Sequence, residues 1–151
     1  MAKDLLLSTK RLRAGRLYLE RALALNDLLD AALERDVGIR LSWYRALAHL
    51  EGEPDGLRMN ELAGRVSYSK SGLTRIVDAL ERKGLVRRVR PEHDRRSIFL
   101  FLTKEGRRTL DRARRHHHRS IDEHFSRHLE DRDVKALLRA LEKIDAHEPA
   151  P

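Results

Sequence analysis

Leucine and alanine recur along most of this chain at the three- and four-residue intervals that place side chains on one face of an α-helix. The first such stretch spans residues 5–35, and in its second half positions 25, 28, 29, 32 and 33 are all leucine or alanine. Further stretches predict helices over residues 42–51, 59–66, 70–83, 104–128 and 131–146. The long first helix indicates packing against a partner chain or a second helical layer, because a small helical head does not need it.

Capping residues define where several of these helices begin and end. Ser69 stands where an N-cap belongs, and Gly84 suits the position just after the end of the same helix. Ser42 and Thr103 are expected to cap the second and fifth helices. The third and fourth helices follow one another through a tight turn, which is the arrangement of a helix-turn-helix.

One stretch departs from the helical repeat. The segment "LVRRVR" (residues 85–90) alternates like a strand, "PEHDRR" forms a turn, and "SIFLFL" (residues 97–102) returns as a second strand. Ile98, Leu100 and Leu102 are expected to anchor this ribbon on the body of the protein. Three helices followed by a hairpin predict a mainly α, winged helix fold.

Composition and charge narrow the function. A net charge of +8 and a pI near 10.3 favour a polyanionic partner, above all nucleic acid. The absence of cysteine excludes disulfides, thiolate metal sites and thiol redox sensing. No nucleophile elbow, P-loop, dinucleotide fingerprint or HExxH is present, so we expect neither an enzyme nor a cofactor. No apolar run approaches the roughly 20 residues of a membrane span, and the start is a poor signal peptide, so a cytoplasmic protein without a membrane partner is expected.

The fourth helix and the hairpin carry side chains suited to the two grooves of DNA. Short Ser71 and Thr74 allow close approach to base edges in the major groove, while Lys70 and Arg75 reach guanine edges or phosphate. At the hairpin tip, arginine suits the negative potential of a narrow minor groove. The residues concerned are Arg95 and Arg96, with Asp94 placed to hold the guanidinium of Arg96.

The segment "MNELAGRVSYSKSGLTRIVDALERKGLVRRVRPEHDRRSIFLFLTKEG" (residues 59–106) resembles the MarR family of bacterial transcription regulators. The flanking helices, including "EHFSRHLEDRDVKALLRALEKI", match too, so the resemblance covers nearly the whole chain. It implies a homodimer that binds a palindromic, double-stranded operator, usually as a repressor. Within one domain of residues 1–151, it assigns 38–103 to the winged helix-turn-helix and 1–37 with 104–147 to dimerisation. Carried over by position, Ser69, Ser71, Thr74 and Arg75 lie on the recognition helix, Arg96 and Asp94 at the wing tip, and Arg88 at the wing base.

The resemblance also implies a small anionic or phenolic effector, bound between the dimerisation layer and the winged helix. Trp43, Tyr44, Leu47 and His117 are the candidates to line that space, and the alternative is that Trp43 and Tyr44 belong to the core.

Two other functions stay open at this point. A zinc-responsive regulator is suggested by consecutive histidines at 116–118, by His49, and by His124 and His128, whose spacing places two imidazoles on one helix face. Adjacent histidines on a helix point in different directions, so no metal site is assigned. A non-specific architectural DNA-binding protein is the third reading.

Overall fold

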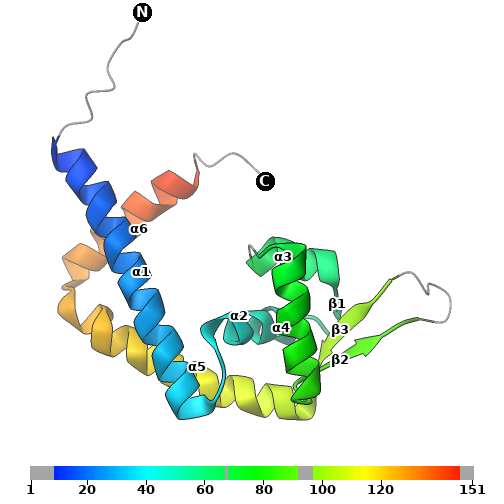
Figure 1. Cartoon of the computed structure of the whole chain (residues 1–151). Helices are drawn as coiled ribbons and strands as arrows, with labels where there is room; N and C mark the ends of the chain where they lie inside the picture. Colours follow the sequence, from blue (N-terminus) through cyan, green and yellow to red (C-terminus); the bar gives the residue numbers. More distant parts are fainter. Residues whose placement is uncertain (1–8, 67, 92–96, 147–151) are drawn as a thin grey trace, which may run out of the picture.

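The computed structural model describes residues 9–66, 68–91 and 97–146 and has a mainly helical fold with one small sheet (Figure 1). This architecture confirms the predicted fold class. Along the chain the elements are α1 (Thr9–Val37), α2 (Leu41–Glu51), β1 (Leu57–Arg58), α3 (Met59–Val66), α4 (Lys70–Arg82), β2 (Val86–Val89), β3 (Phe99–Leu102), α5 (Lys104–His124), the 3-10 helix η1 (Ser126–His128) and α6 (Asp131–Asp145).

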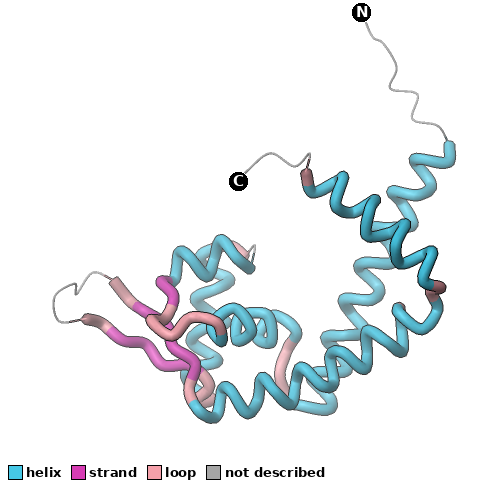
Figure 2. Tube along the Cα trace, turned by 180° about the vertical axis from the view of Figure 1, so that it is seen from behind, coloured by secondary structure: helices cyan, strands magenta, loops and turns pink. Residues whose placement is uncertain are grey.

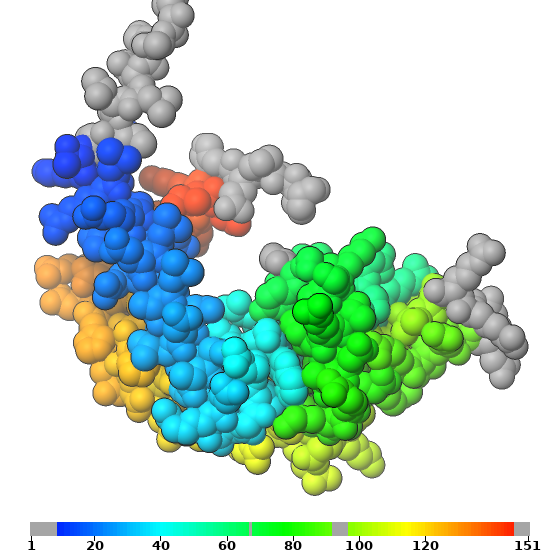
Figure 3. Space-filling view, viewed as in Figure 1, coloured from blue at the N-terminus to red at the C-terminus, as the bar shows by residue number. Residues whose placement is uncertain are grey.

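These elements form two regions joined by α5. Helices α2, α3 and α4 and the sheet make a compact head, whereas α1 and α6 extend away from it at the far end of α5, as both views of the backbone show (Figures 1 and 2). The space-filling view shows an open hollow between the upper part of α1 and the head (Figure 3). No helix among the described residues is long and apolar enough to cross a membrane.

The core lies inside the head and along the seam where the second half of α1 packs on α5. Its largest fully buried side chains are Leu33, Leu47, Leu62, Leu73, Leu80, Leu100 and Leu110. In contrast, the first half of α1 and all of α6 contribute no buried side chain. Folding of this single chain therefore completes the head and leaves much of α1 and α6 with an unburied apolar face.

The sheet has three strands instead of the two predicted. Its order is β1-β3-β2, and both pairs are antiparallel, with Leu57 opposite Leu100 and Val86 opposite Leu102. Strand β1 escaped prediction because a two-residue strand has no sequence period and exists only through its partner. The predicted anchoring is confirmed for Leu100, which is fully buried, and for Leu102, which packs against the core. Ile98 is only partly buried and lines a groove instead.

Two of the predicted N-caps are present. The side chain of Ser69 accepts a hydrogen bond from Gly72 N at 3.1 Å, and that of Thr103 accepts one from Gly106 N at 2.9 Å. Gly84 ends α4 with φ of +70°, a conformation that costs glycine little.

The prediction for Ser42 is wrong. Helix α2 begins at Leu41, one residue earlier, and its N-cap position holds Arg40, which makes no side-chain cap. The carboxylate of Asp30, from α1, instead accepts the hydrogen bond of Leu41 N at 2.6 Å and pairs with Arg40 at 3.0 Å. A cap supplied from eleven residues away is a tertiary contact.

The predicted end of the fifth helix is also wrong. Helix α5 stops at His124 because Phe125 leaves the helical conformation with φ of −141°, and η1 follows. His128 therefore lies in η1, and its ring bonds to the carbonyl of Glu123 at 3.1 Å. His124 and His128 therefore do not lie on one face of a single helix, as the zinc hypothesis had expected of this pair.

Candidate nucleic-acid interface

The start of α4 presents a row of small and basic side chains to solvent. Leu73, Val77 and Leu80 bury the opposite face of this helix in the head. Burial of this face determines how the helix is oriented, and therefore which of its residues face solvent. They are the sequence-predicted Ser69, Lys70, Ser71, Thr74 and Arg75, and all five are exposed.

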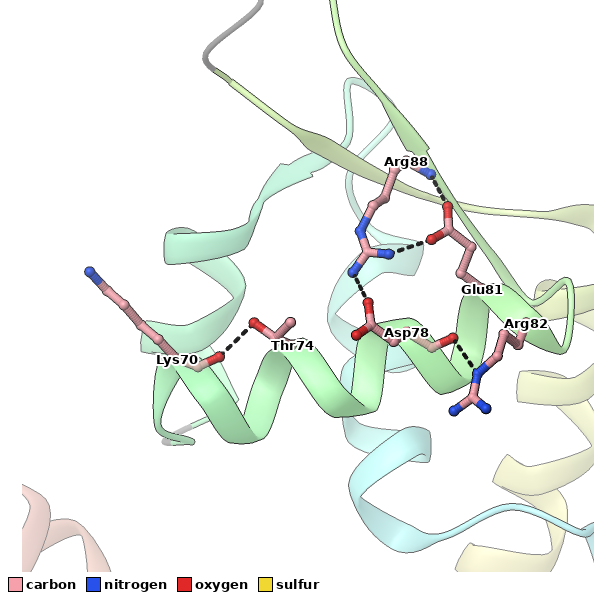
Figure 4. A network of polar contacts seen from close by, with 6 residues as sticks. All are labelled: Lys70, Thr74, Asp78, Glu81, Arg82 and Arg88. Atoms are coloured by element: carbon pink, nitrogen blue, oxygen red, sulfur yellow. Dashed lines mark hydrogen bonds and ion pairs between the residues drawn. The ribbon is translucent and has the colours of Figure 1, made fainter.

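Local hydrogen bonds hold the hydroxyl groups of this row. The Thr74 hydroxyl donates to the carbonyl of Lys70 at 2.8 Å, which leaves its oxygen as an acceptor (Figure 4). The Ser69 hydroxyl caps the helix and lies 3.3 Å from that of Ser71. The free N–H groups of such a helix start favour an anion such as phosphate.

A groove of about 670 Å³ separates this helix from the strands of the wing. Lys70 and Thr74 line it on the side of α4, and Arg58, Arg88 and Arg90 line it on the side of the sheet. Three of these cationic residues, Lys70, Arg58 and Arg90, stand around one groove next to exposed hydroxyl groups, an arrangement that suits a polyanion. Arg58 and Arg90 were not identified from sequence, because a groove between elements has no linear signature.

Arg88 is held by two carboxylates of α4. Its Nη2 lies 2.6 Å from Asp78 Oδ1, its Nη1 hydrogen-bonds to Glu81 Oε2, and its backbone N donates to Glu81 Oε1 at 3.3 Å (Figure 4). Burial works against the charge, but the hydrogen bonds and charges of both carboxylates outweigh it and raise the pKa of Arg88 above its ordinary value. Asp78 and Glu81 were missed as partners, although their three-residue spacing places both on one helix face.

The outer face of the sheet pairs arginine with phenylalanine. The guanidinium of Arg87 lies 4.5 Å from the ring centre of Phe101, and that of Arg58 lies 5.3 Å from the ring centre of Phe99. Such cation–π contacts shield aromatic rings that would otherwise face water. The predicted tip residues Asp94, Arg95 and Arg96 lie outside the described residues.

The predicted effector residues are only partly brought together. Tyr44 and His117 meet edge to face with ring centres 4.5 Å apart, at the junction of α2 and α5. Trp43 lies beside Lys83 instead, and Leu47 is fully buried. Both Trp43 and Tyr44 pack against the core while remaining partly exposed.

His117 has an unusual environment for a histidine. Its Nδ1 is buried and finds no hydrogen-bond partner within the part of the chain that the structure describes. Burial, followed by the nearby charges of His118 and Arg45, lowers the pKa of His117 below its ordinary value of 6.5. Burial thus favours the neutral form of this ring. No group of three or more metal-ligating side chains occurs in residues 9–66, 68–91 and 97–146.

Comparison with known proteins assigns these elements to one family. A model of the MarR family matches residues 37–97. The crystal structure of Sco3205, a MarR family transcriptional regulator from Streptomyces coelicolor solved in complex with DNA, aligns with a TM-score of 0.84 and 32% identity, and the alignment covers 95% of each chain. The crystal structure of CouR from Rhodococcus jostii RHA1 bound to p-coumaroyl-CoA aligns with a TM-score of 0.74 and 25% identity, over 91% of this chain and 95% of that chain.

A curated relative gives a shorter match. The homoprotocatechuate degradative operon repressor of Escherichia coli is 34% identical over 67 residues, which are 44% of this chain and 45% of the repressor. The match thus spans less than half of that relative's length. The match to Sco3205, in contrast, runs over nearly the whole of both chains. The chain belongs to the MarR family of transcriptional regulators.

Proposed function

We propose that this chain is a sequence-specific DNA-binding regulator that acts as a homodimer on a palindromic operator. The observation that carries the proposal is the exposed start of α4 beside a groove lined by Lys70, Arg58, Arg88 and Arg90. The net charge of +8 suits the same partner. The complex of Sco3205 with DNA supports it, because that protein aligns over 95% of this chain.

Each exposed residue of α4 has a role that follows from its chemistry. Ser71 and Thr74 are short enough to let the helix enter the major groove, where the Thr74 oxygen accepts from a base and its methyl group packs on thymine. Arg75 hydrogen-bonds to a guanine edge and Lys70 binds a phosphate. Ser69 caps the start of the helix and so positions both residues. At the wing tip, Arg95 and Arg96, with Asp94 as brace, keep their predicted role in the minor groove.

An uncovered apolar surface supports the homodimer. Leu12, Leu19 and Leu23 on α1 are 55%, 62% and 68% exposed, and on α6 Leu138 and Ile144 are 53% and 56% exposed. Large apolar side chains left exposed on two helices in this way suggest a protein interface.

The second copy is the occupant that fits this surface. An apolar groove of about 520 Å³ runs between α1 and α6 and includes Leu17, Tyr18, Phe125 and Leu141. Residues 1–37 and 104–147 would then form the dimerisation region, and residues 38–103 would form the head. Two heads related by two-fold symmetry read half-sites roughly 34–36 Å apart.

An effector that weakens DNA binding is the mode of regulation we propose, with repression as the sign. The junction of Tyr44 and His117 offers an aromatic face and a buried nitrogen acceptor or donor, which suit a phenolic or carboxylate compound. CouR with bound p-coumaroyl-CoA supports a ligand, and the operon repressor of E. coli supports repression.

Selection of duplexes from a random library by the purified protein tests the proposal. We expect enrichment of a palindrome and a dimer by sedimentation. Arg75→Ala should cost about 1–3 kcal/mol on the selected duplex, and Lys70→Ala should weaken all duplexes alike and lower the salt slope by about one. Arg132→Ala on α6, where Arg132 pairs with Glu130 at 3.1 Å, is the matched control. A library without enrichment would favour an architectural protein and refute specific binding.

A further inference from the structure

The contacts of Arg88 join the two elements that face DNA. Its guanidinium comes from β2, which leads to the wing tip, and both of its carboxylate partners come from α4. The stripe of α4 that carries Lys70 and Thr74 continues through Asp78 to Glu81, so one helix face serves DNA at its start and the wing strand at its end (Figure 4).

The contact of Arg88 with Asp78 and Glu81, called the brace below, holds the strand and the helix in a fixed orientation. Two nitrogens of one planar guanidinium meet two different carboxylates, and Glu81 also accepts from the backbone N of Arg88. The side chain of Arg88 is 24% exposed, whereas Asp78 and Glu81 are 49% and 40% exposed. Arg88 is therefore the most enclosed of the three, and a rigid fork of this kind fixes orientation as well as distance.

The same contact neutralises two negative charges beside the proposed DNA path. Asp78 lies one helical turn after Thr74, and Glu81 lies one turn further. Without Arg88, both carboxylates would repel the phosphates that Lys70 and Arg90 attract. The two terminal nitrogens of the guanidinium already donate to carboxylates, so they are less available to a phosphate.

We propose that Arg88 is a positioning residue, which fixes the angle between the wing and the recognition helix through Asp78 and Glu81 and thereby sets sequence discrimination. This inference rests on the proposed function in DNA binding. It differs from a role in which the guanidinium of Arg88 contacts DNA directly. The two roles lead to opposite results when the carboxylates are removed.

The decisive variant is the double substitution Asp78→Asn with Glu81→Gln. It removes two negative charges and weakens their hold on the Arg88 guanidinium, because a neutral amide oxygen is a weaker acceptor than a carboxylate, so a direct phosphate contact would make binding equal or tighter. The brace predicts a loss of about ten-fold in the ratio of affinities for the library-selected duplex and a scrambled duplex of the same composition. Arg88→Lys, which keeps the charge but loses the fork, should lose a similar factor while its salt slope stays unchanged.

Two further variants test whether the three residues act together. Combining Arg88→Lys with the double substitution should add no further loss, because all three residues act through one contact. Arg87→Ala removes a neighbouring arginine from the opposite face of the same strand, where it contacts Phe101, and its discrimination ratio should stay near that of the wild type. Additive losses, or unchanged discrimination in the Asn/Gln protein, would overturn the proposal.

A measurement without DNA separates this inference from the proposed function. Amide hydrogen exchange across residues 86–89 should speed up in Arg88→Lys and in the Asn/Gln protein but not in Arg87→Ala. If the wild type selects no duplex, specific DNA binding fails, and the brace is then judged by exchange alone. Exchange that is unchanged in all variants rejects the brace whatever the protein binds.

Discussion

Thr103 occupies the point where the wing returns to the body, and replacing it by valine is a sharp test of how the head is joined to α5. Its Oγ1 accepts from Gly106 N at 2.9 Å and donates towards the carbonyl oxygens of Gly84 at 2.6 Å and Leu85 at 3.1 Å. One hydroxyl thus links the end of α4, the approach to β2 and the first turn of α5. Valine keeps the branched shape and removes only these bonds.

The expected loss follows from the bonds that disappear. An N-cap is worth about 0.5–2 kcal/mol, and a further hydrogen bond about 1 kcal/mol. Thr103→Val should therefore lower the free energy of unfolding by about 2 kcal/mol. For a chain of this size that corresponds to a fall of about 4–8 °C in Tm.

Thermal unfolding followed by circular dichroism at one fixed protein concentration measures the effect. Thr103→Ser is the matched control, because it keeps the hydroxyl group and removes only a methyl group, and it should stay close to the wild type. A valine protein within about 1 °C of the wild type would refute the assigned role of the hydroxyl. A serine protein as unstable as the valine protein would show that the methyl group matters instead.

Three other substitutions test separate contacts. Gly106→Ala should destabilise by at least about 3 kcal/mol in urea unfolding although alanine favours helices, because a Cβ there would lie 2.0 Å from the Leu85 carbonyl oxygen; a stable variant would contradict this packing. Asp30→Ala should cost about 1 kcal/mol in the same assay through loss of the α2 cap, whereas an equal loss in Asp30→Asn would argue against capping, since asparagine also caps. Because the pKa of His117 is lowered from 6.5, the folded state resists protonation, so unfolding free energy should fall as pH drops below about 6.5; His117→Phe should fall less, and parallel pH profiles would exclude this origin.

The parts of the fold that sequence predicted are those encoded locally. The bounds of α4 follow from Ser69 before it and Gly84 after it, and its buried leucines fix which residues face outward. The resemblance to MarR regulators is confirmed by the comparisons, and a family of transcriptional regulators also confirms that the chain is not an enzyme.

The parts that escaped prediction depend on contacts between distant residues. Strand β1 exists because Leu57 pairs with Leu100, and α2 is capped by Asp30 rather than by Ser42. The partners of Arg88 escaped for the same reason, since the return of β2 alongside α4 brings residues 78, 81 and 88 together. The sequence shows which chemical groups a side chain such as that of Arg88 can bind, whereas its actual partners are known only from the fold.

Helix α5 is a lever. Its 21 residues span about 31 Å, with one end fastened to the head at Thr103 and the other beside α1. A tilt of about 5° at one end displaces the other by roughly 3 Å over that length. A movement at Tyr44 and His117, near the middle of this helix, is about doubled at its end. A rigid helix thus converts a shift of about 1.5 Å at its middle into one of about 3 Å, which is comparable to the spacing of successive base pairs.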